Sequence, residues 1–346
     1  MINPTEIKID LGIVNAMNRG ILAGAIVLVL VIVLPIFVPY IFDYAYGDKV
    51  ETAHLQTLVG NESNATIRAQ KLMSWIKDNT LAPYNYNMYV SFGGWAIVNI
   101  SNKPHVFIRT DKASWFIVQK LGNCGEDAWY FAELMNKSGF RSRIIQVKGE
   151  DHEFAEFYDE NGKKIVVDPS SNRFINDTLA HGDEVGKYWS YLEAQDLAGN
   201  TEDVTQEYLR NTSPLTINVT GTEFLEGRIR ITIESLFLKN ISQRYSQPIE
   251  VVSYNFDKNK TYAVRLGAKK EYQITDTLDL YLINFKEVEQ LDLSQNRSVE
   301  ITPKMLLKPE NMEINSLGVI YSILGLSVFI LANKVSQKYF KSKVRL

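Results

Sequence analysis

The sequence predicts an α+β protein whose large folded part lies between two apolar, helix-forming segments. Two runs without charged residues stand near the ends of the chain. Between them, a helical pattern is followed by three strand-like segments and then by many short alternating runs. The hydrophobic content of 45% is sufficient for buried cores. The balance of 37 Lys and Arg against 40 Asp and Glu lacks the basic excess of nucleic-acid binders, so we expect no nucleic-acid partner.

The first apolar run, residues 20–42, contains no charged side chain. As a helix it would be roughly 35 Å long, enough to cross a hydrocarbon core of about 30 Å. A cleaved signal peptide is the alternative, but its apolar region is usually about 7–15 residues long. We therefore expect 1–19 to be cytoplasmic and 20–42 to be a transmembrane helix that Pro35 bends without interrupting.

The second apolar run, residues 316–332, is shorter and would also suit a buried core helix. The residues that follow favour a membrane segment, because they are basic without any acidic residue among them: Lys334, Lys338, Lys341, Lys343 and Arg345. A basic tail directly after an apolar run is typical of a cytoplasmic end. We expect 316–332 to be a second transmembrane helix and 333–346 a cytoplasmic tail.

Charge and glycosylation motifs agree on the topology. The whole chain carries −3, which leaves −8 on residues 43–315. Asn-x-Ser/Thr motifs occur only between the apolar runs, since Asn3 is followed by proline. The candidate glycosylation sites are Asn61, Asn64, Asn99, Asn136, Asn176, Asn211, Asn218, Asn240, Asn259 and Asn296. We expect a two-pass protein of the cell membrane with both termini cytoplasmic and the large part extracytoplasmic.

Two outer domains are expected between the apolar runs. In the first, 43–200, the predicted helices are 64–80, capped by Asn64 or Thr66, and 124–137. Strands are predicted at 143–147, 152–158 and 164–168, a loop at 82–95, and a connector with some helix at 195–213. In the second, 210–308, short alternating runs separated by turn residues predict a small antiparallel β-sandwich.

The single cysteine, Cys124, excludes an intramolecular disulfide and a multi-cysteine metal site, and we expect no metal and no cofactor. Gly122 and Gly125 flank it at the predicted start of a helix, where partial positive charge favours a thiolate. The glycines would leave room for a substrate, and nearby backbone N–H groups could bind an oxyanion. A lone cysteine is otherwise most often a small buried residue.

His152 begins one predicted strand and Asp168 ends the next. Cys124, His152 and Asp168 therefore occur in an order suited to a nucleophile, a base and a carboxylate that orients the base. The register of the hairpin formed by these two strands decides whether His152 and Asp168 share a face. A two-residue turn would place Asp168 opposite Ala155 and turn it away from His152. A three-residue turn with Gly162 left-handed would place Asp168 opposite Phe154, diagonal to His152 and about 7–8 Å from it. We predict the second register.

Residues 121–171 resemble the transglutaminase-like superfamily, which includes transglutaminases, related cysteine proteases and peptide:N-glycanases. The matching features are a Gly-x-Cys-Gly-Glu helix start, an aromatic residue and a leucine on the helix, a Gly-Phe-x-x-Arg turn, an Asp-His strand and an Asp-Pro strand end. In this chain they are Gly122–Glu126, Phe131 and Leu134, Gly139–Arg143, Asp151-His152 and Asp168-Pro169.

The resemblance implies a papain-like core in which Cys124 is the nucleophile, His152 the base and Asp168 its orienting residue. Many relatives carry tryptophan where this chain has Phe154, which keeps an apolar wall. Relatives often use an upstream tryptophan near the oxyanion, and Trp95 and Trp115 are the candidates. Either could instead be a core residue.

Three functional hypotheses remain open on sequence grounds. The first is an outward-facing cysteine enzyme, a protease or transamidase, that acts on amide or peptide bonds of a surface protein, peptide or glycoprotein through a thioester. Peptide:N-glycanase-like deglycosylation shares that mechanism. The second is a catalytically inactive structural module that binds an envelope partner through the same fold. The third, a transport or signalling subunit, is weakest because neither apolar run contains a charged residue.

Overall fold

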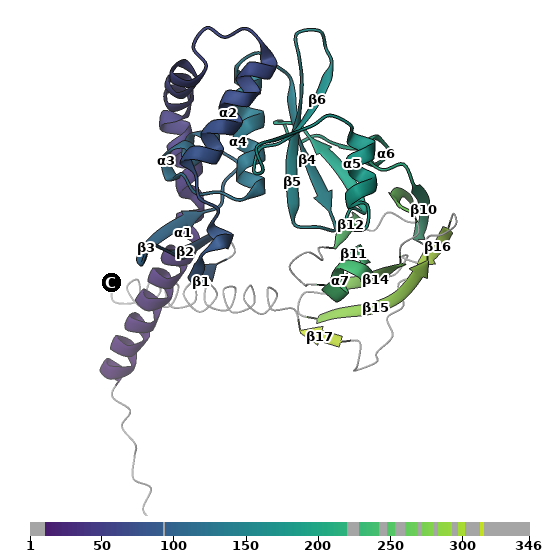
Figure 1. Cartoon of the computed structure of the whole chain (residues 1–346). Coiled ribbons are helices and arrows are strands. Elements are labelled where there is room, and N and C mark those ends of the chain that lie inside the picture. Colours follow the sequence, from purple (N-terminus) through teal and green to yellow (C-terminus); the bar gives the residue numbers. More distant parts are fainter. Residues whose placement is uncertain are drawn as a thin grey trace, which may run out of the picture. The chain divides into compact units, whose positions relative to one another are not determined.

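A computed structural model describes residues 11–92, 94–219, 228–241, 248–252, 260–268, 271–279, 283–292, 297–301 and 312–314 (Figure 1). Over these residues the protein is a mixed α+β structure with several antiparallel sheets, as predicted. The predicted second apolar helix, 316–332, and the basic tail, 333–346, lie outside the described residues.

The chain divides into two compact units. The first contains the described residues up to Ile145 together with Glu153–Asn176 and Gln195–Asn200. The second contains Gln146–His152, Asp177–Ala194 and the described residues from Thr201 onward.

Helix α1 runs without interruption from Leu11 to Leu58 and includes the charge-free run 20–42 (Figure 1). The predicted helix is therefore confirmed, and it continues through both Pro35 and Pro39. Of the helices in the described part of the chain, none is both long and apolar enough to cross a membrane. The transmembrane placement of 20–42 stays a prediction.

The first unit is built on α2 (Ala65–Asn79), α3 (Ala113–Gln119) and α4 (Cys124–Lys137). The two predicted helices are confirmed, and Asn64 is the N-cap of α2, since its side chain accepts a hydrogen bond from the Ile67 N–H at 3.0 Å. Their apolar sides meet in one buried core. Its largest members are Leu72, Met73, Phe116, Tyr130, Phe131, Leu134, Met135 and Phe157.

A three-stranded antiparallel sheet replaces the loop that was predicted for 82–95. It follows the short helix η1 (Pro83–Asn85) and contains β1 (Asn87–Phe92), β2 (Trp95–Ile100) and β3 (Lys103–Ile108) in that order. The loop prediction was wrong because β1 is an edge strand. Its residues from Asn87 to Ser91 are exposed on both faces, so the sequence there shows no alternation of apolar and polar residues.

The three predicted strands of the middle region are confirmed as β4 (Ser142–Lys148), β5 (His152–Tyr158) and β6 (Lys164–Asp168). They belong to a six-stranded sheet of order β7-β6-β5-β4-β8-β9. Its other strands are β7 (Arg173–Ile175), β8 (Tyr191–Gln195) and β9 (Thr201–Asp203). The helices α5 (Thr178–Val185) and α6 (Thr205–Tyr208) stand in the connecting segments, and α6 confirms the helix predicted there.

Two further sheets form most of the second unit. One has the order β13-β10-β16 and the other the order β12-β11-β14-β15-β17. Their strands are β10 (Thr212–Val219), β11 (Arg228–Ser235), β12 (Ile249–Val252), β13 (Lys260–Gly267), β14 (Glu271–Asp279), β15 (Ile283–Asp292), β16 (Arg297–Ile301) and β17 (Met312–Ile314).

Two details of this region differ from the prediction. Strands β10 and β16 pair in parallel, so the smaller sheet is mixed. The run after β11 turns into helix α7 (Leu236–Ile241) and does not extend the strand. On β10, buried and half-buried residues alternate along the strand, as in a sheet with one covered face. The face-to-face packing of a sandwich stays a prediction.

Candidate functional site

Cys124 is the first residue of α4 and is half-buried. The residues around it form a capping box, in which Asn123 is the N-cap and the Glu126 carboxylate accepts a hydrogen bond from the Asn123 N–H at 2.9 Å. This pairing fixes where the helix begins. The thiol is therefore held at the positive end of the helix dipole, as predicted from the flanking sequence.

The two glycines beside Cys124 have different surroundings. A Cβ atom on Gly122 would overlap the Phe116 ring and lie 2.8 Å from the Cβ of Glu126. On Gly125 it would meet only the carboxyl group of Glu153, with Oε2 at 3.3 Å and Cδ at 3.7 Å. The space at Gly122 is thus filled by the core, and the expectation that this glycine leaves room for a substrate was wrong.

The hairpin of β5 and β6 has the predicted three-residue register. Ala155 pairs with Val167 and Tyr158 with Lys164, and the Asp159 N–H donates to the Lys163 carbonyl at 3.0 Å. Gly162 adopts a left-handed conformation with φ of 74°. Continued by one pair, this register places Phe154 opposite Asp168. His152 and Asp168 therefore share one face of the hairpin, on a diagonal.

The other face of β5 meets α4. Ala155 and Phe157 belong to the buried core together with residues of α4, and Glu153 lies against Gly125. Strand alternation then assigns His152, Phe154 and Glu156 to the opposite face. The register gives His152 and Asp168 a common face of the hairpin, but it does not by itself bring either of them to Cys124.

A buried ion pair occupies the face that carries Phe154. Glu156 is fully buried and accepts from the Arg143 Nε at 2.7 Å, with Nη2 at 2.5 Å. The Lys164 Nζ lies 3.7 Å away. Because Arg143 lies on β4, Glu156 on β5 and Lys164 on β6, these three side chains link three adjacent strands. Phe154 is fully buried beside it on β5, so it can serve as the predicted apolar wall only from within the core.

Two buried carboxyl groups follow Cys124 in the first turn of α4. Burial raises the pKa of Glu126, which is 8% exposed. Burial also raises the pKa of Asp127 well above its usual range, and the charges of Glu126 and Asp168 add to this. The Asp127 Oδ1 has no hydrogen-bond partner among the described residues. These conditions favour a neutral Asp127, three residues from Cys124 and within electrostatic reach of Asp168.

Both candidate upstream tryptophans, Trp95 and Trp115, are buried or bonded within the fold. Trp95 begins β2 and is only 8% exposed. The Trp115 Nε1 donates to the Gln119 Oε1 at 2.9 Å, and its ring lies edge-on to Phe42 with the centroids 5.4 Å apart. An indole N–H that is already bound inside its own helix is not available to an oxyanion, which argues against Trp115 in that role.

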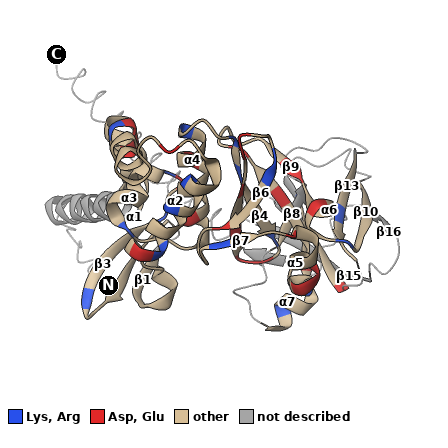
Figure 2. Ribbon diagram, turned by 45° about the horizontal axis from the view of Figure 1, so that its top comes forward, with Lys and Arg blue, Asp and Glu red and all other residues tan. Residues whose placement is uncertain are grey.

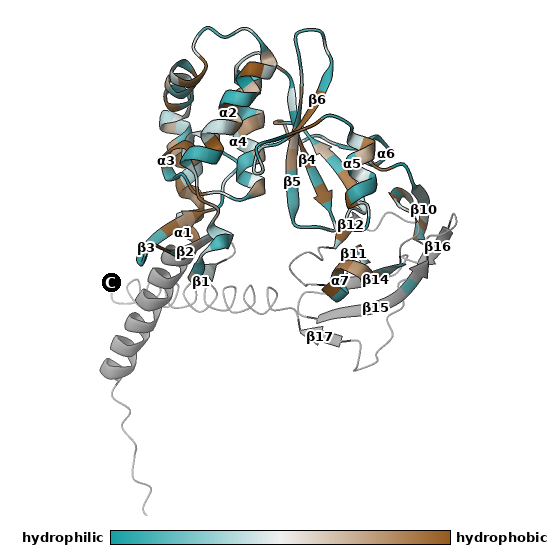
Figure 3. Ribbon diagram, in the orientation of Figure 1, coloured by the Kyte–Doolittle hydropathy of each residue, from teal (hydrophilic) through white to brown (hydrophobic). Residues whose placement is uncertain are grey.

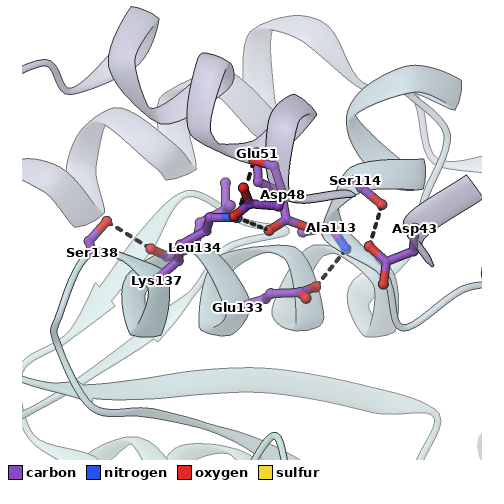
Figure 4. A network of polar contacts seen from close by, with 9 residues as sticks. All are labelled: Asp43, Asp48, Glu51, Ala113, Ser114, Glu133, Leu134, Lys137 and Ser138. Carbon is purple, nitrogen blue, oxygen red and sulfur yellow. Dashed lines mark hydrogen bonds and ion pairs between the residues drawn. The ribbon is translucent and has the colours of Figure 1, made fainter. Parts of the chain in front are cut away.

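Polar contacts attach the C-terminal half of α1 to α3 and α4 (Figure 4). The Lys137 Nζ lies 2.9 Å from both Asp48 Oδ1 and Glu51 Oε2. The Glu133 carboxylate accepts from the Ala113 N–H at 2.7 Å. Burial raises the pKa of Glu133 to about 7 and also raises that of Glu51. This network holds α4 from the side of the helix remote from the sheet.

An aromatic cluster adds to the same attachment. The His54 Nε2 and the Tyr130 Oη are 2.7 Å apart, and the Trp75 ring stacks on Tyr130 at 5.1 Å. Burial, and to a lesser degree the charge of Lys120, lowers the pKa of His54 to about 4. His54 is therefore a neutral structural residue at pH 7 and not a second candidate base.

The candidate glycosylation sites differ in how accessible their Asn side chains are. A glycan is attached through the Asn side-chain nitrogen. In Asn136 this nitrogen donates to the carbonyls of Ala132, at 2.8 Å, and Ser142, at 2.9 Å, so it is occupied in the fold. Asn99 and Asn218 are half-buried, and Asn259 and Asn296 lie outside the described residues. The exposed candidates are Asn61, Asn64, Asn176, Asn211 and Asn240.

The carboxyl groups of Glu126 and Asp127 and the Arg143–Glu156 pair were not predicted as parts of the site. Only Glu126 had a local signal, because Asn123-x-x-Glu126 is a capping-box pattern. Across the part of the chain that the structure describes, no group of three or more His, Cys, Asp and Glu side chains could hold a metal ion. A comparison with protein-family models finds no matching family, and a comparison with curated proteins finds no match.

Proposed function

We propose that this protein is a membrane-anchored, outward-facing cysteine enzyme that cleaves or exchanges amide bonds through a thioester. The proposal assigns Cys124 as nucleophile, His152 as base and Asp168 as the residue that orients His152. It includes the two-pass topology, with 20–42 and 316–332 in the membrane and both termini cytoplasmic.

The observation that carries the proposal is the register of β5 and β6. Of the two possible turns, the protein has the one that gives His152 and Asp168 a common face. A cysteine at a capped helix start supports it. Asp168 also influences the pKa of Asp127 in the first turn of that helix, which relates it to the end of α4 where Cys124 stands. A neutral Asp127 would leave Asp168 as the carboxylate that stabilises a protonated His152.

The proposed reaction requires the His152 side chain, at the first position of β5, to reach Cys124 past the end of the strand. His152 then accepts the thiol proton, and the sulfur attacks the amide carbonyl carbon. The tetrahedral intermediate collapses when the C–N bond breaks, and His152 donates its proton to the departing amine. The resulting thioester is then attacked by water, which gives hydrolysis, or by a second amine, which gives transamidation. Attack on a glycosylated asparagine amide would release the glycan by the same steps.

The test measures the rate of Cys124 alkylation by iodoacetamide from pH 4 to 9 in the full-length protein. We expect a fast reaction that persists well below pH 7 and that is slowed by His152→Ala. The matched control is His105→Ala, which removes an exposed histidine of β3. Since Cys124 is the only cysteine, every alkylated molecule reports on this site.

A slow reaction that rises only near the usual thiol pKa of about 8.5, and that neither histidine variant changes, would contradict the catalytic assignment. It would favour the alternative of a catalytically inactive module that binds an envelope partner. A fast, His152-dependent reaction would instead be followed by assays with peptide, glutamine-containing and glycopeptide substrates, which distinguish the three possible outcomes of the thioester.

A further inference from the structure

The sheet β1-β2-β3 carries apolar side chains in register across all three strands. Trp95 and Ile108 form one row, and Val90, Ile97 and Val106 form the next row on the same face. Trp95 and Ile108 are buried, whereas Val90 is 39% and Val106 57% exposed. The second row is therefore an apolar strip that the described residues leave partly uncovered.

Other apolar side chains near this strip are exposed as well. Met88 precedes a β-bulge in β1, and Tyr89 is the extra residue of that bulge, with 58% of its surface exposed. An exposed edge strand with apolar residues on both sides normally favours association. We name the set Tyr89, Val90 and Val106 the sheet patch.

The segment that contains the sheet patch is free of acidic residues. Between Asp78 and Asp111 there is no Asp or Glu, while Lys103 and Arg109 are both basic. Lys103 is the first residue of β3, and Figure 2 shows a blue segment on that strand. This contrasts with the net charge of −8 on residues 43–315. The segment is thus complementary in charge to an anionic surface.

The sheet also contacts α1 within its charge-free run. A Cβ atom on Gly94, in the turn between β1 and β2, would lie 2.9 Å from the Ile36 Cγ1. In Figure 3 the part of α1 next to β2 is coloured as hydrophobic, and so is much of β2. Exposed apolar side chains continue from the sheet onto this part of the helix: Val33, Leu34, Phe37, Tyr40 and Ile41.

The position of Ile36 along α1 indicates how deep the turn between β1 and β2 would lie in a membrane. Ile36 precedes the end of the charge-free run, Phe42, by six residues, which is roughly 9 Å along a helix. Amphipathic elements that lie in the membrane interface bury their apolar face about 5–10 Å into the headgroup and acyl boundary. If 20–42 is in the bilayer, the turn between β1 and β2 is at that depth.

We propose that the sheet patch inserts into the outer leaflet and that lipid is its partner. The inference rests on the proposed membrane topology of α1 and goes beyond it, because it adds a second, non-helical membrane contact next to the helix. A lipid partner follows from the continuity with the apolar part of α1, from the absence of acidic residues and from the exposed tyrosines. Tyrosine is enriched at the membrane interface.

The test uses nitroxide labels on the full-length protein in vesicles of phosphatidylcholine and phosphatidylglycerol. Single labels are placed by Val106→Cys, by Val90→Cys, and by Leu30→Cys inside the charge-free run, each combined with Cys124→Ser. Lys163→Cys, at the exposed turn between β5 and β6, is the control. Collision rates with oxygen, which partitions into lipid, and with a water-soluble nickel chelate are compared, and circular dichroism verifies that each variant is folded.

We expect a higher ratio of oxygen to nickel collisions at positions 106 and 90 than at 163. A ratio at 106 and 90 equal to that at 163, with a high ratio at 30, would overturn the inference and leave the membrane helix standing. Low ratios at all four positions would contradict the topology itself. Shielding of 106 from both reagents, with spin–spin broadening between labels, would show a second copy of the chain on the sheet patch and would also overturn the inference.

Discussion

Gly122 and Gly125 flank the same cysteine but are glycine for different reasons. The Phe116 ring occupies the space beside Gly122, whereas only the end of the flexible Glu153 side chain stands beside Gly125. Gly122 is therefore part of the packing that sets the position of Cys124. A side chain added at Gly125 would contact only Glu153, at the surface of the site.

This difference predicts opposite results for two alanine substitutions. Gly122→Ala should lower the free energy of unfolding by about 1–3 kcal/mol, because the added methyl group overpacks the core. Gly125→Ala should change it by less than about 1 kcal/mol, since alanine favours the helix and the Glu153 carboxylate can move. Urea unfolding followed by tryptophan fluorescence measures both. Equal losses would show that the two glycines are not distinguished by Phe116.

At the scale of elements, the contact of α1 with α3 and α4 contains the carboxyl group of Glu133, whose pKa burial raises to about 7. The pKa of Glu133 in the folded protein, about 7, lies above its ordinary value of 4.5. The folded protein thus retains a proton that the unfolded chain releases between these values. Glu133 costs no stability below pH 4.5, and its ionisation destabilises the fold progressively as the pH rises through 7.

Glu133→Gln should therefore become more stable than the wild type as the pH increases from 4.5 to 7.5, with little difference at pH 4. The amide oxygen can still accept from the Ala113 N–H. His54 acts with the opposite sign, because its lowered pKa of about 4 costs stability as the pH falls below 6.5. It is present in both proteins and cancels in the difference.

The measurement is the unfolding free energy of both proteins at intervals across this pH range. The matched control is Asp78→Asn, which neutralises an exposed carboxylate near the end of α2. A constant offset between Glu133→Gln and the wild type would contradict the assignment of the titration to Glu133.

At the scale of the whole molecule, α1 belongs to two regions of the chain. The charge-free run occupies residues 20–42 of this helix, and the last turns of the helix supply Glu51, His54 and Leu55 to the first folded unit. One uninterrupted helix therefore connects the proposed membrane segment with the element that carries Cys124. We expect the site to be held at a fixed height above the membrane and not on a flexible linker.

Truncated chains test the contributions of the two parts of α1 to stability separately. A chain beginning at residue 43 should keep a cooperative thermal transition, whereas one beginning at residue 61 should unfold at a clearly lower temperature. The shorter chain leaves the Tyr130 hydroxyl without its His54 partner, at a cost of about 1–3 kcal/mol, and also loses apolar contacts. Each kcal/mol lowers Tm by roughly 2–4 °C in domains of this size. Equal transitions in calorimetry would show that α1 is dispensable for the unit.

Local patterns in the sequence were sufficient for several elements. Helix α4 has the predicted bounds because its cap and its apolar spacing lie within a few residues of each other. The register of β5 and β6 was predicted because a three-residue turn with a left-handed glycine determines the pairing of both strands. The pairing of β1 with β2 was missed, because an edge strand exposed on both faces has no alternating pattern.

The sequence by itself determined helices α2 and α4, strands β4, β5 and β6 and the register of the β5–β6 hairpin, since each depends on neighbours in the chain, and it supplied the residues that we propose for catalysis. Only the tertiary structure decided that Phe116 fills the space at Gly122, that Asp127 is buried and that β16 pairs in parallel with β10. It alone also decided that the turn at Gly94 meets Ile36. These facts depend on which distant segments pack together, because burial and contact are properties of the folded chain and not of local spacing.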